Sequence, residues 1–138
     1  MQLAEASNGS ITLISEIQLT GSFNRQTMVW DPSRNLVVIG YRDTSNSNSG
    51  TIKTISVVGN VLTENVTTSV FENAAVDSIS LVYNTTNTNV IVSWNTESSQ
   101  GYIGRSVVAT PGAPTTYGTT AAMVDTAKYT SSVYDPTN

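Results

Sequence analysis

The sequence contains no cysteine and no histidine among its 138 residues. Without cysteine the chain forms no disulfide and no thiolate nucleophile, and without histidine it has no imidazole to act as a base or a metal ligand. Serine–histidine–aspartate triads, cysteine nucleophiles and the usual zinc sites are therefore excluded. The lack of cysteine does not decide the redox compartment, because extracellular proteins without disulfides exist.

Charge of either sign is also scarce. Charged residues make up 12% of the chain, and the net charge is −4. No two basic residues are adjacent, so there is no basic patch for nucleic acid or for an anionic membrane. No apolar run approaches the ~20 residues of a membrane span, and residues 1–5 lack the basic flank and apolar run of a secretory signal. We therefore expect no nucleic-acid partner and no membrane insertion.

Helical periodicity is missing as well, because apolar residues alternate with polar ones or occur in short runs between turn residues. Serine, threonine, asparagine and glycine take the place of much of the usual charge, and the hydrophobic content is 38%. Valine, isoleucine, tyrosine and tryptophan recur in regular runs, which argues against disorder. The sequence predicts a single all-β domain with a polar surface.

A short pattern occurs three times along the chain, in residues 28–35, 81–87 and 132–138. Its aromatic anchors are Trp30, Tyr83 and Tyr134, which lie 53 (83 − 30) and 51 (134 − 83) positions apart. The apolar run 36–43 that follows the first copy has a counterpart in 90–95. A fixed period of this size is typical of repeat architectures.

Each repeat is predicted to contain four antiparallel strands joined by hairpin-length turns. In the second copy the expected strands are 78–83, 90–94, 101–109 and a weaker one at 116–123, and in the first copy the third and fourth are 51–58 and 66–71. Four-stranded antiparallel units that repeat at this interval are typical of β-propeller blades. The fold class is therefore predicted as all-β, with blade-like, β-propeller-like repeats.

The repeats divide the chain into a single array of two full and two partial blades. The expected parts are a partial blade at 1–27, repeat 1 at 28–80, repeat 2 at 81–131 and the start of repeat 3 at 132–138. Two full blades are too few to close a ring. We expect other copies of the chain, or further sequence of the same protein, to complete the partial blades.

Equivalent positions in the repeats yield specific expectations for packing. The aromatic anchors are expected at equivalent places near strand ends and to contribute to packing between blades. The predicted core contains Val38, Ile39, Val90 and Val92. The residues after the anchors are Asp31, Asn84 and Asp135, which fit either a ring at a channel mouth or, more simply, a cap on the turn that follows.

Residues 29–43 read Val-Trp-Asp-Pro-Ser-Arg-Asn-Leu-Val-Val-Ile-Gly-Tyr-Arg-Asp, and residues 46–51 read Asn-Ser-Asn-Ser-Gly-Thr. This pattern resembles a blade-like repeat of bacteriophage structural and tail-fibre-like proteins, notably those of marine phages. The second copy departs from it at Asn84 and at Trp94-Asn95. The resemblance implies a virion component that contacts a host surface, with a virion or extracellular location.

The candidate ligand-binding residues are Arg42, Asp43, Asn46, Asn48, Tyr102 and Tyr117. The guanidinium of Arg42 suits a carboxylate or a sugar acid, although pairing with Asp43 would make it structural. Segment 43–50 is rich in oxygen ligands, but it lacks the spacing of a calcium loop and reads more simply as a polar hairpin. The two tyrosines do not recur in the other copy and are candidates for sugar stacking. No catalytic residue, metal site or cofactor is predicted.

Three classes of function fit these features. The first is a non-enzymatic structural or host-attachment component of a phage-like virion, a fibre or surface protein. It would have copies of itself, other virion proteins and host-surface glycan as partners. The second is a carbohydrate-binding, lectin-like β-propeller module. The third is a glycan-cleaving enzyme, which requires two carboxylates at a defined separation.

Overall fold

The computed structural model describes residues 1–7, 10–98, 101–124, 130–133 and 135. The described chain is all-β and antiparallel, which confirms the predicted class, and it contains no helix that could cross a membrane. Its strands are β1 (Gln2–Ser7), β2 (Ser10–Glu16), β3 (Phe23–Asp31), β4 (Leu36–Asp43), β5 (Ser49–Val58), β6 (Val61–Glu64), β7 (Ser69–Asn84), β8 (Asn89–Ser98), β9 (Gly101–Thr110), β10 (Thr116–Tyr117) and β11 (Ala121–Val124).

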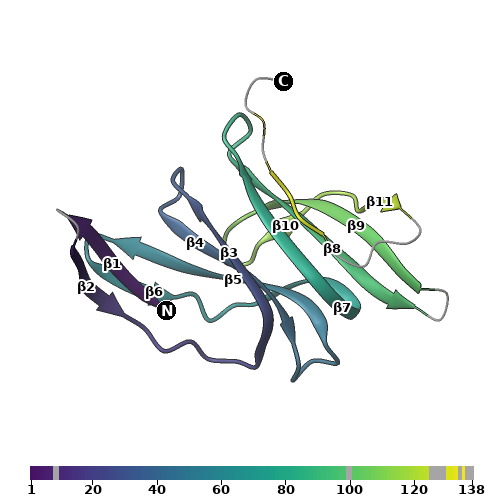
Figure 1. Ribbon diagram of the computed structural model, residues 1–138, viewed down its shortest axis with the longest axis horizontal. Coiled ribbons are helices and arrows are strands. Elements are labelled where there is room, and N and C mark those ends of the chain that lie inside the picture. The colour runs from purple at the N-terminus through teal and green to yellow at the C-terminus, as the bar shows by residue number, and fades with distance from the viewer. Residues whose placement is uncertain (8–9, 99–100, 125–129, 134, 136–138) are drawn as a thin grey trace.

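The strands form a small hairpin sheet and one large open sheet (Figure 1). The hairpin pairs β1 with β2. The large sheet has the order β10-β9-β8-β7-β5-β4-β3, with β6 also on β5 and β11 also on β9. Because β3 and β10 stand at opposite ends of this order, the sheet does not close on itself.

The large sheet consists of two strand groups that share β7. The first half of β7 pairs with β5, and the second half pairs with β8. We call β3, β4, β5 and β6 with the first half of β7 the first group. The second group is the second half of β7 with β8, β9, β10 and β11. Figure 1 shows the two groups side by side, with β7 leading from one into the other.

Strand register repeats between the two groups. Asp31 pairs with Leu36 in the first group, as Asn84 pairs with Asn89 in the second. A bulge interrupts β3 between Asn24 and Thr27, and the matching bulge in β7 lies between Val76 and Ile79. Residues that are 53 positions apart in the sequence therefore have equivalent strand partners in the two groups.

The fourth strand of each group is split, which differs from the prediction. In the first group β5 pairs with β6 at one end and with β7 at the other. The predicted strand 66–71 therefore starts in the connection between β6 and β7 and ends inside β7. In the second group β9 pairs with β10 and then β11, and a gap divides the predicted strand 116–123. The predicted strand 78–83 is the end of the 16-residue β7, so the expected repeat boundary at 80/81 falls inside a strand.

The third strands are offset by 54 residues rather than 53. Tyr41 pairs with Thr51, whereas its counterpart Trp94 pairs with Arg105. The difference arises because the β8–β9 hairpin is one residue longer than the β4–β5 hairpin. Thr51 therefore matches Arg105 rather than Tyr102.

Two apolar cores lie on opposite faces of the first group. The first core fills the space between the two groups, and its members are Leu36, Val38, Ile52, Val76, Leu81, Val90, Val92, Trp94, Val107 and Ala109. The second core is formed by Ile39, Tyr41, Ile55 and Leu62, and Met1, Ile17 and Leu19 pack against it. All four predicted core residues are buried, which confirms that expectation.

Trp30 and Tyr83 are each the second-last residue of their strand, so the predicted equivalence of these two anchors is confirmed. Tyr134 lies outside the described residues. The expected core packing of Trp30 is wrong, because its side chain is 43% exposed. Tyr83 is partly buried and packs against the first core. Equivalent positions thus have different surroundings in the two groups.

Candidate functional site

Four of the six predicted ligand-binding residues lie together in the β4–β5 hairpin, at the end of the first group. Asp43 accepts hydrogen bonds from the backbone N–H of Ser45 at 3.0 Å and from its hydroxyl at 2.6 Å. The amide of Asn46 donates to the hydroxyl of Ser49 at 3.0 Å. These bonds hold the polar loop in one shape, as expected for a self-capped hairpin.

The loop is also attached to the second half of β7. The carbonyl of Asn48 accepts a hydrogen bond from the backbone N–H of Val76 at 3.1 Å. Asn48 and Ser47 both have positive φ, at 63° and 53°. The hairpin is therefore a preformed surface supported by both strand groups.

Arg42 is the member of this hairpin with unused hydrogen-bonding capacity. Its Nε atom is buried without a hydrogen-bond partner among the described residues. No ion pair joins Arg42 to Asp43 or to another described acid, so the expected alternative of an Arg42–Asp43 pair is not formed. Because the Nε atom is shielded from solvent, a carboxylate, sulfate or phosphate ligand would have to meet this guanidinium through its terminal nitrogens.

The two predicted tyrosines lie far from each other, near opposite ends of β9. Tyr102 pairs with Glu97 close to the β8–β9 hairpin and is partly exposed. Tyr117, in β10, packs against the first core, and its hydroxyl donates to the carbonyl of Ser69 at 2.7 Å. Burial raises the pKa of Tyr117. The structure thus does not bring the tyrosines together, and it gives Tyr117 a packing contact between the two groups.

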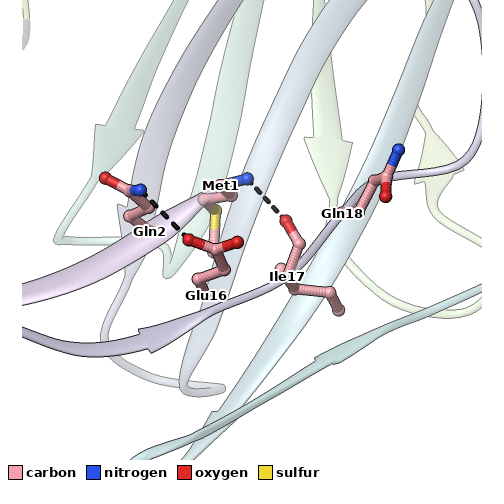
Figure 2. A pocket seen from close by; sticks show the side chains of 5 residues that line it. All are labelled: Met1, Gln2, Glu16, Ile17 and Gln18. Atoms are coloured by element: carbon pink, nitrogen blue, oxygen red, sulfur yellow. Dashed lines mark hydrogen bonds between the residues drawn. The ribbon is translucent and has the colours of Figure 1, made fainter.

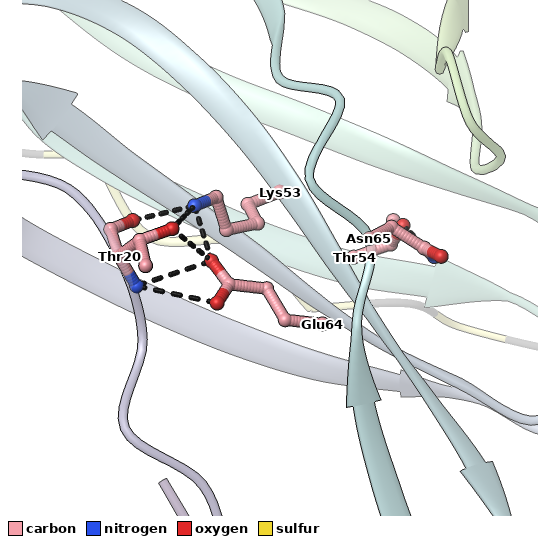
Figure 3. Close-up of polar contacts among 5 residues, drawn as sticks. All are labelled: Thr20, Lys53, Thr54, Glu64 and Asn65. Carbon is pink, nitrogen blue, oxygen red and sulfur yellow. Dashed lines mark hydrogen bonds and ion pairs between the residues drawn. The ribbon is translucent and has the colours of Figure 1, made fainter.

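A buried ion pair that the sequence did not indicate lies on the face of the first group that carries the second core (Figure 3). Lys53 is almost fully buried and forms an ion pair with Glu64 while also donating to the carbonyl of Thr20. Glu64 accepts from the N–H and the hydroxyl of Thr20, the latter at 2.9 Å. Burial by itself raises the pKa of Glu64, but the hydrogen bonds from Lys53 and Thr20 outweigh it and lower that pKa.

Three further acids are held in ion pairs. Arg34 contacts Asp31 at 2.9 Å, Arg25 contacts Asp77 at 3.1 Å and Arg105 lies 3.8 Å from Glu72. Burial opposes ionisation of Asp31, but the bonds from Ser33 and Arg34 lower its pKa overall. The described residues contain no cluster of three or more acidic side chains that could hold a metal ion.

Asp31 and Asn84 cap the turns that follow them. The Oδ1 atom of Asp31 accepts from the N–H of Ser33, and that of Asn84 accepts from the N–H of Thr86, both at 3.0 Å. The simpler expected role of these two residues, as turn caps, is thereby confirmed. Arg34 also donates to the carbonyl of Thr88 at 2.6 Å, which ties the two equivalent turns together.

Grooves in the described surface are shallow and polar, or lie on the second core. One of about 510 Å³ lies beside the β1–β2 hairpin and is lined by Met1, Gln2, Glu16, Ile17 and Gln18 (Figure 2). The amino group of Met1 donates to the Ile17 carbonyl at 2.6 Å, and Gln2 donates to Glu16 at 3.2 Å. Because these polar groups bind each other, the groove offers few of them to a ligand.

Comparisons of the chain with protein-family models, with curated proteins and with solved structures found no match.

Proposed function

We propose that the chain is a non-enzymatic structural or host-attachment component of a phage-like virion, a fibre or surface protein. The observation that carries the proposal is the recurrence of the same strand register, bulge and turn caps in two successive groups. Repeated units of this kind build extended rigid surfaces, and loops held on a rigid scaffold are the usual place for recognition.

The two strand groups are, on this proposal, successive propeller-like blades. Support comes from β7, which is the outer strand of the first group and then becomes the first strand of the second. In a blade array the outermost strand of one blade leads into the innermost strand of the next in this manner. Further blades would be supplied by other copies or by further sequence.

The β4–β5 hairpin is the proposed contact with the host. Its polar side chains are held in place by the bonds of Asp43 and Asn46, and the half-buried Arg42 forms no ion pair with a described acid, so its charge is available to an acidic group. The ligand class that fits is a surface glycan carrying a carboxylate or a sulfate. A lectin-like module would use the same hairpin, and a glycan array separates the two functions by showing saturable binding to one sugar.

The location on a particle is tested by gold-labelled antibody against the chain. Particles released by lysis of the producing cells and banded by density should carry label at regular positions. Label found only in the soluble fraction would contradict a virion component. Arg42→Gln should reduce adsorption of such particles to host cells, whereas Arg34→Gln, which alters a turn at the other end of the strands, serves as the control.

A glycan-cleaving enzyme is the third alternative, and it predicts a different result. It needs an acid and a second carboxylate that are free to contact the sugar. Asp31, Glu64, Glu72 and Asp77 are each engaged by a basic side chain instead. Release of reducing sugar from a host polysaccharide, abolished by Asp43→Asn or Asp77→Asn, would overturn the non-enzymatic proposal.

A further inference from the structure

The packing of one strand group on the other shows which surfaces of a repeat fit each other. Gly40, on the face of β4 that looks toward the second group, lies close to Ile79 and Leu81 of β7. A Cβ atom at this glycine would be 3.3 Å from either side chain. Val29 of β3 packs against the same core. We call the surface of a repeat that carries Gly40 and Val29 its rear face, and the surface that carries Leu81 and Tyr83 its front face.

The same contact begins again at the end of the described chain. Residues 130–133 lie on the rear face of the second group, where Ser93 is the counterpart of Gly40. The hydroxyl of Ser132 donates to that of Ser93 at 3.0 Å, and the N–H of Thr130 donates to the hydroxyl of Ser78 at 3.0 Å. Thr130 and Ser132 match Ile79 and Leu81 at a spacing of 51 residues (132 − 81). The third copy of the repeat therefore starts on the second as the second starts on the first.

One front face remains uncovered in the described residues. Met28 and Trp30 are the counterparts of Leu81 and Tyr83, and they are 55% and 43% exposed, whereas Leu81 is buried. Beside them runs an apolar groove of about 390 Å³, whose lining includes Leu19, Phe23 and Ile39. The front face of the first group is thus covered at its outer strands by residues 17–20 and open at its inner strand.

One rear-face side chain is likewise uncovered. Val133 matches Val29 in the repeat, yet it is 91% exposed while Val29 packs against the first core. Ser132 contacts Ser80 and Ser93 of the second group, whereas the side chain of Val133 lies in solvent. Val133 is therefore exposed, whereas its counterpart Val29 is covered by a front face. Likewise Met28 and Trp30 form an exposed front face, whereas the equivalent front face of the second group is covered by a rear face.

We infer that two copies of this chain associate head to tail, with Val133 of one copy packing on the Met28–Trp30 front face of the next. The occupant of that face is a second copy, because the surface that packs on the inner strand of the front face in the second group is a rear face of the same repeat. The contact is heterologous, so each copy still offers one free face and association continues beyond two chains unless the assembly closes into a ring. This inference does not depend on the proposed role in a virion.

Sedimentation of the full chain with two charge variants tests the interface. Wild-type protein should show a weight-average mass that rises with concentration beyond that of two chains. Met28→Lys removes the acceptor face and Val133→Glu removes the docking residue, so each variant alone should remain a monomer. A mixture of the two should form dimers and nothing larger, because only one intact pair of surfaces remains.

Controls separate this contact from general stickiness and from misfolding. Val66→Glu introduces the charge of Val133→Glu at a side chain that is 84% exposed and is not among those packed against either core, and its association should match that of wild type. Iodide quenching of tryptophan should fall as the protein associates, since Trp30 becomes covered, but it should stay constant in Trp30→Phe, which retains only the buried Trp94. Unchanged circular dichroism verifies the fold of each variant.

Three results would overturn the inference. One is a wild-type chain that stays monomeric at every concentration, as expected if another segment of a longer protein covers the front face. Another is a Val133→Glu variant that associates like wild type, which would mean that front faces pair with each other. The third is a failure of the two variants to form dimers when mixed.

Discussion

Lys53 and Glu64 form a buried ion pair at positions that the second group fills differently. By strand pairing, Lys53 corresponds to Val107 and Glu64 corresponds to Tyr117. Both Glu64 and Tyr117 bind the stretch of chain that enters their own strand group, one through Thr20, which precedes β3, and the other through the carbonyl of Ser69, at the start of β7. The same structural task is therefore carried out by an ion pair in one group and by a tyrosine hydroxyl in the other.

Removing half of the ion pair should be costly at neutral pH. Glu64→Gln leaves the Lys53 ammonium buried without its counter-charge, and we expect a loss of about 3–5 kcal/mol in the free energy of unfolding. The pair of Arg25 and Asp77 offers a control, because the Arg25 side chain is 55% exposed and Arg25→Gln should cost at most about 1 kcal/mol. Urea denaturation measures both. A loss below about 1 kcal/mol for Glu64→Gln would show that water reaches the pair.

The same variant has a defined pH dependence. The pKa of Glu64 in the folded protein is lower than its ordinary value of 4.5, so the carboxylate stabilises the fold fully above that pH. The stabilisation is lost as the pH falls through the folded pKa. The stability difference between wild type and Glu64→Gln should therefore be largest near neutrality and shrink below about pH 4.5. A difference that grows on acidification would contradict the ion pair.

Tyr117→Phe isolates the corresponding hydrogen bond in the second group. The ring still packs against the first core, but the Ser69 carbonyl loses a donor, so we expect a loss of about 1 kcal/mol. Tyr102→Phe is the matched control and should change stability by less than about 0.5 kcal/mol. Thermal unfolding monitored by circular dichroism distinguishes the two. Equal effects would argue against a specific role for the Tyr117 hydroxyl.

At the level of strands, the close approach of β5 and β7 depends on Gly50. A Cβ atom there would overlap the ring of Phe71, which packs on Trp94 with 4.9 Å between ring centroids. Glycine at this position lets the aromatic pair close one end of the first core. The residue at 50 therefore controls the place where the two strand groups join.

Gly50→Ala should destabilise the protein by about 1–3 kcal/mol, because the Phe71 ring must move. In a Phe71→Leu background the smaller side chain leaves room for the added methyl group, so the cost of Gly50→Ala should drop. A double-mutant cycle by urea denaturation measures this coupling. Additive effects would mean that the methyl group clashes with something other than the ring.

Most individual strands could be predicted from the sequence, but their joining could not. Segments 36–43 and 101–109 stand out because apolar residues run between polar turns, and β4 and β9 coincide with them almost to the residue. The split fourth strands were missed because their halves are short, and Val66, which looked like a strand residue, is exposed between them. The continuity of β7 was missed because apolar and polar residues do not alternate in its first half, which therefore carries no period-two signal.

On the scale of the whole molecule, the first core joins both strand groups, and β7 belongs to each of them. The two groups should therefore unfold together. The β1–β2 hairpin is attached through the second core and the Thr20 contacts instead. Its stability should be lower and partly independent.

Native-state hydrogen exchange tests this division. Amides of β4 and β8 should exchange only through global unfolding, with one common free energy, and those of β1 and β2 should exchange faster. Trp94→Ala, which truncates a fully buried side chain of the first core, should lower the free energy by about 3–5 kcal/mol in β4 as well as in β8. Loss of protection in β8 alone would show that the groups are independent.

The candidate site illustrates what lies beyond sequence reasoning at this scale. The hairpin residues 42, 43, 46 and 48 are close in the chain, so their proximity in space follows from the turn itself. The exposure of Trp30 and the burial of Lys53 depend on what packs against each face, and a single repeat does not encode that. Identical repeat positions have different surroundings wherever their neighbours differ.

The sharing of β7 also constrains how an array of this kind can grow or shrink. A cut at 80/81, where the sequence pattern restarts, would divide a continuous strand and separate residues 76–80 from the rest of the ladder that β7 forms with β8. A cut at the tip of an equivalent pair of hairpins, such as 31–36 and 84–89, removes or adds a whole period while every ladder is restored. Gene duplication, deletion or engineered lengthening should therefore succeed when its breakpoints lie at hairpin tips. The unit that is duplicated or deleted would then begin and end at hairpin tips, whereas the strand groups divide within β7.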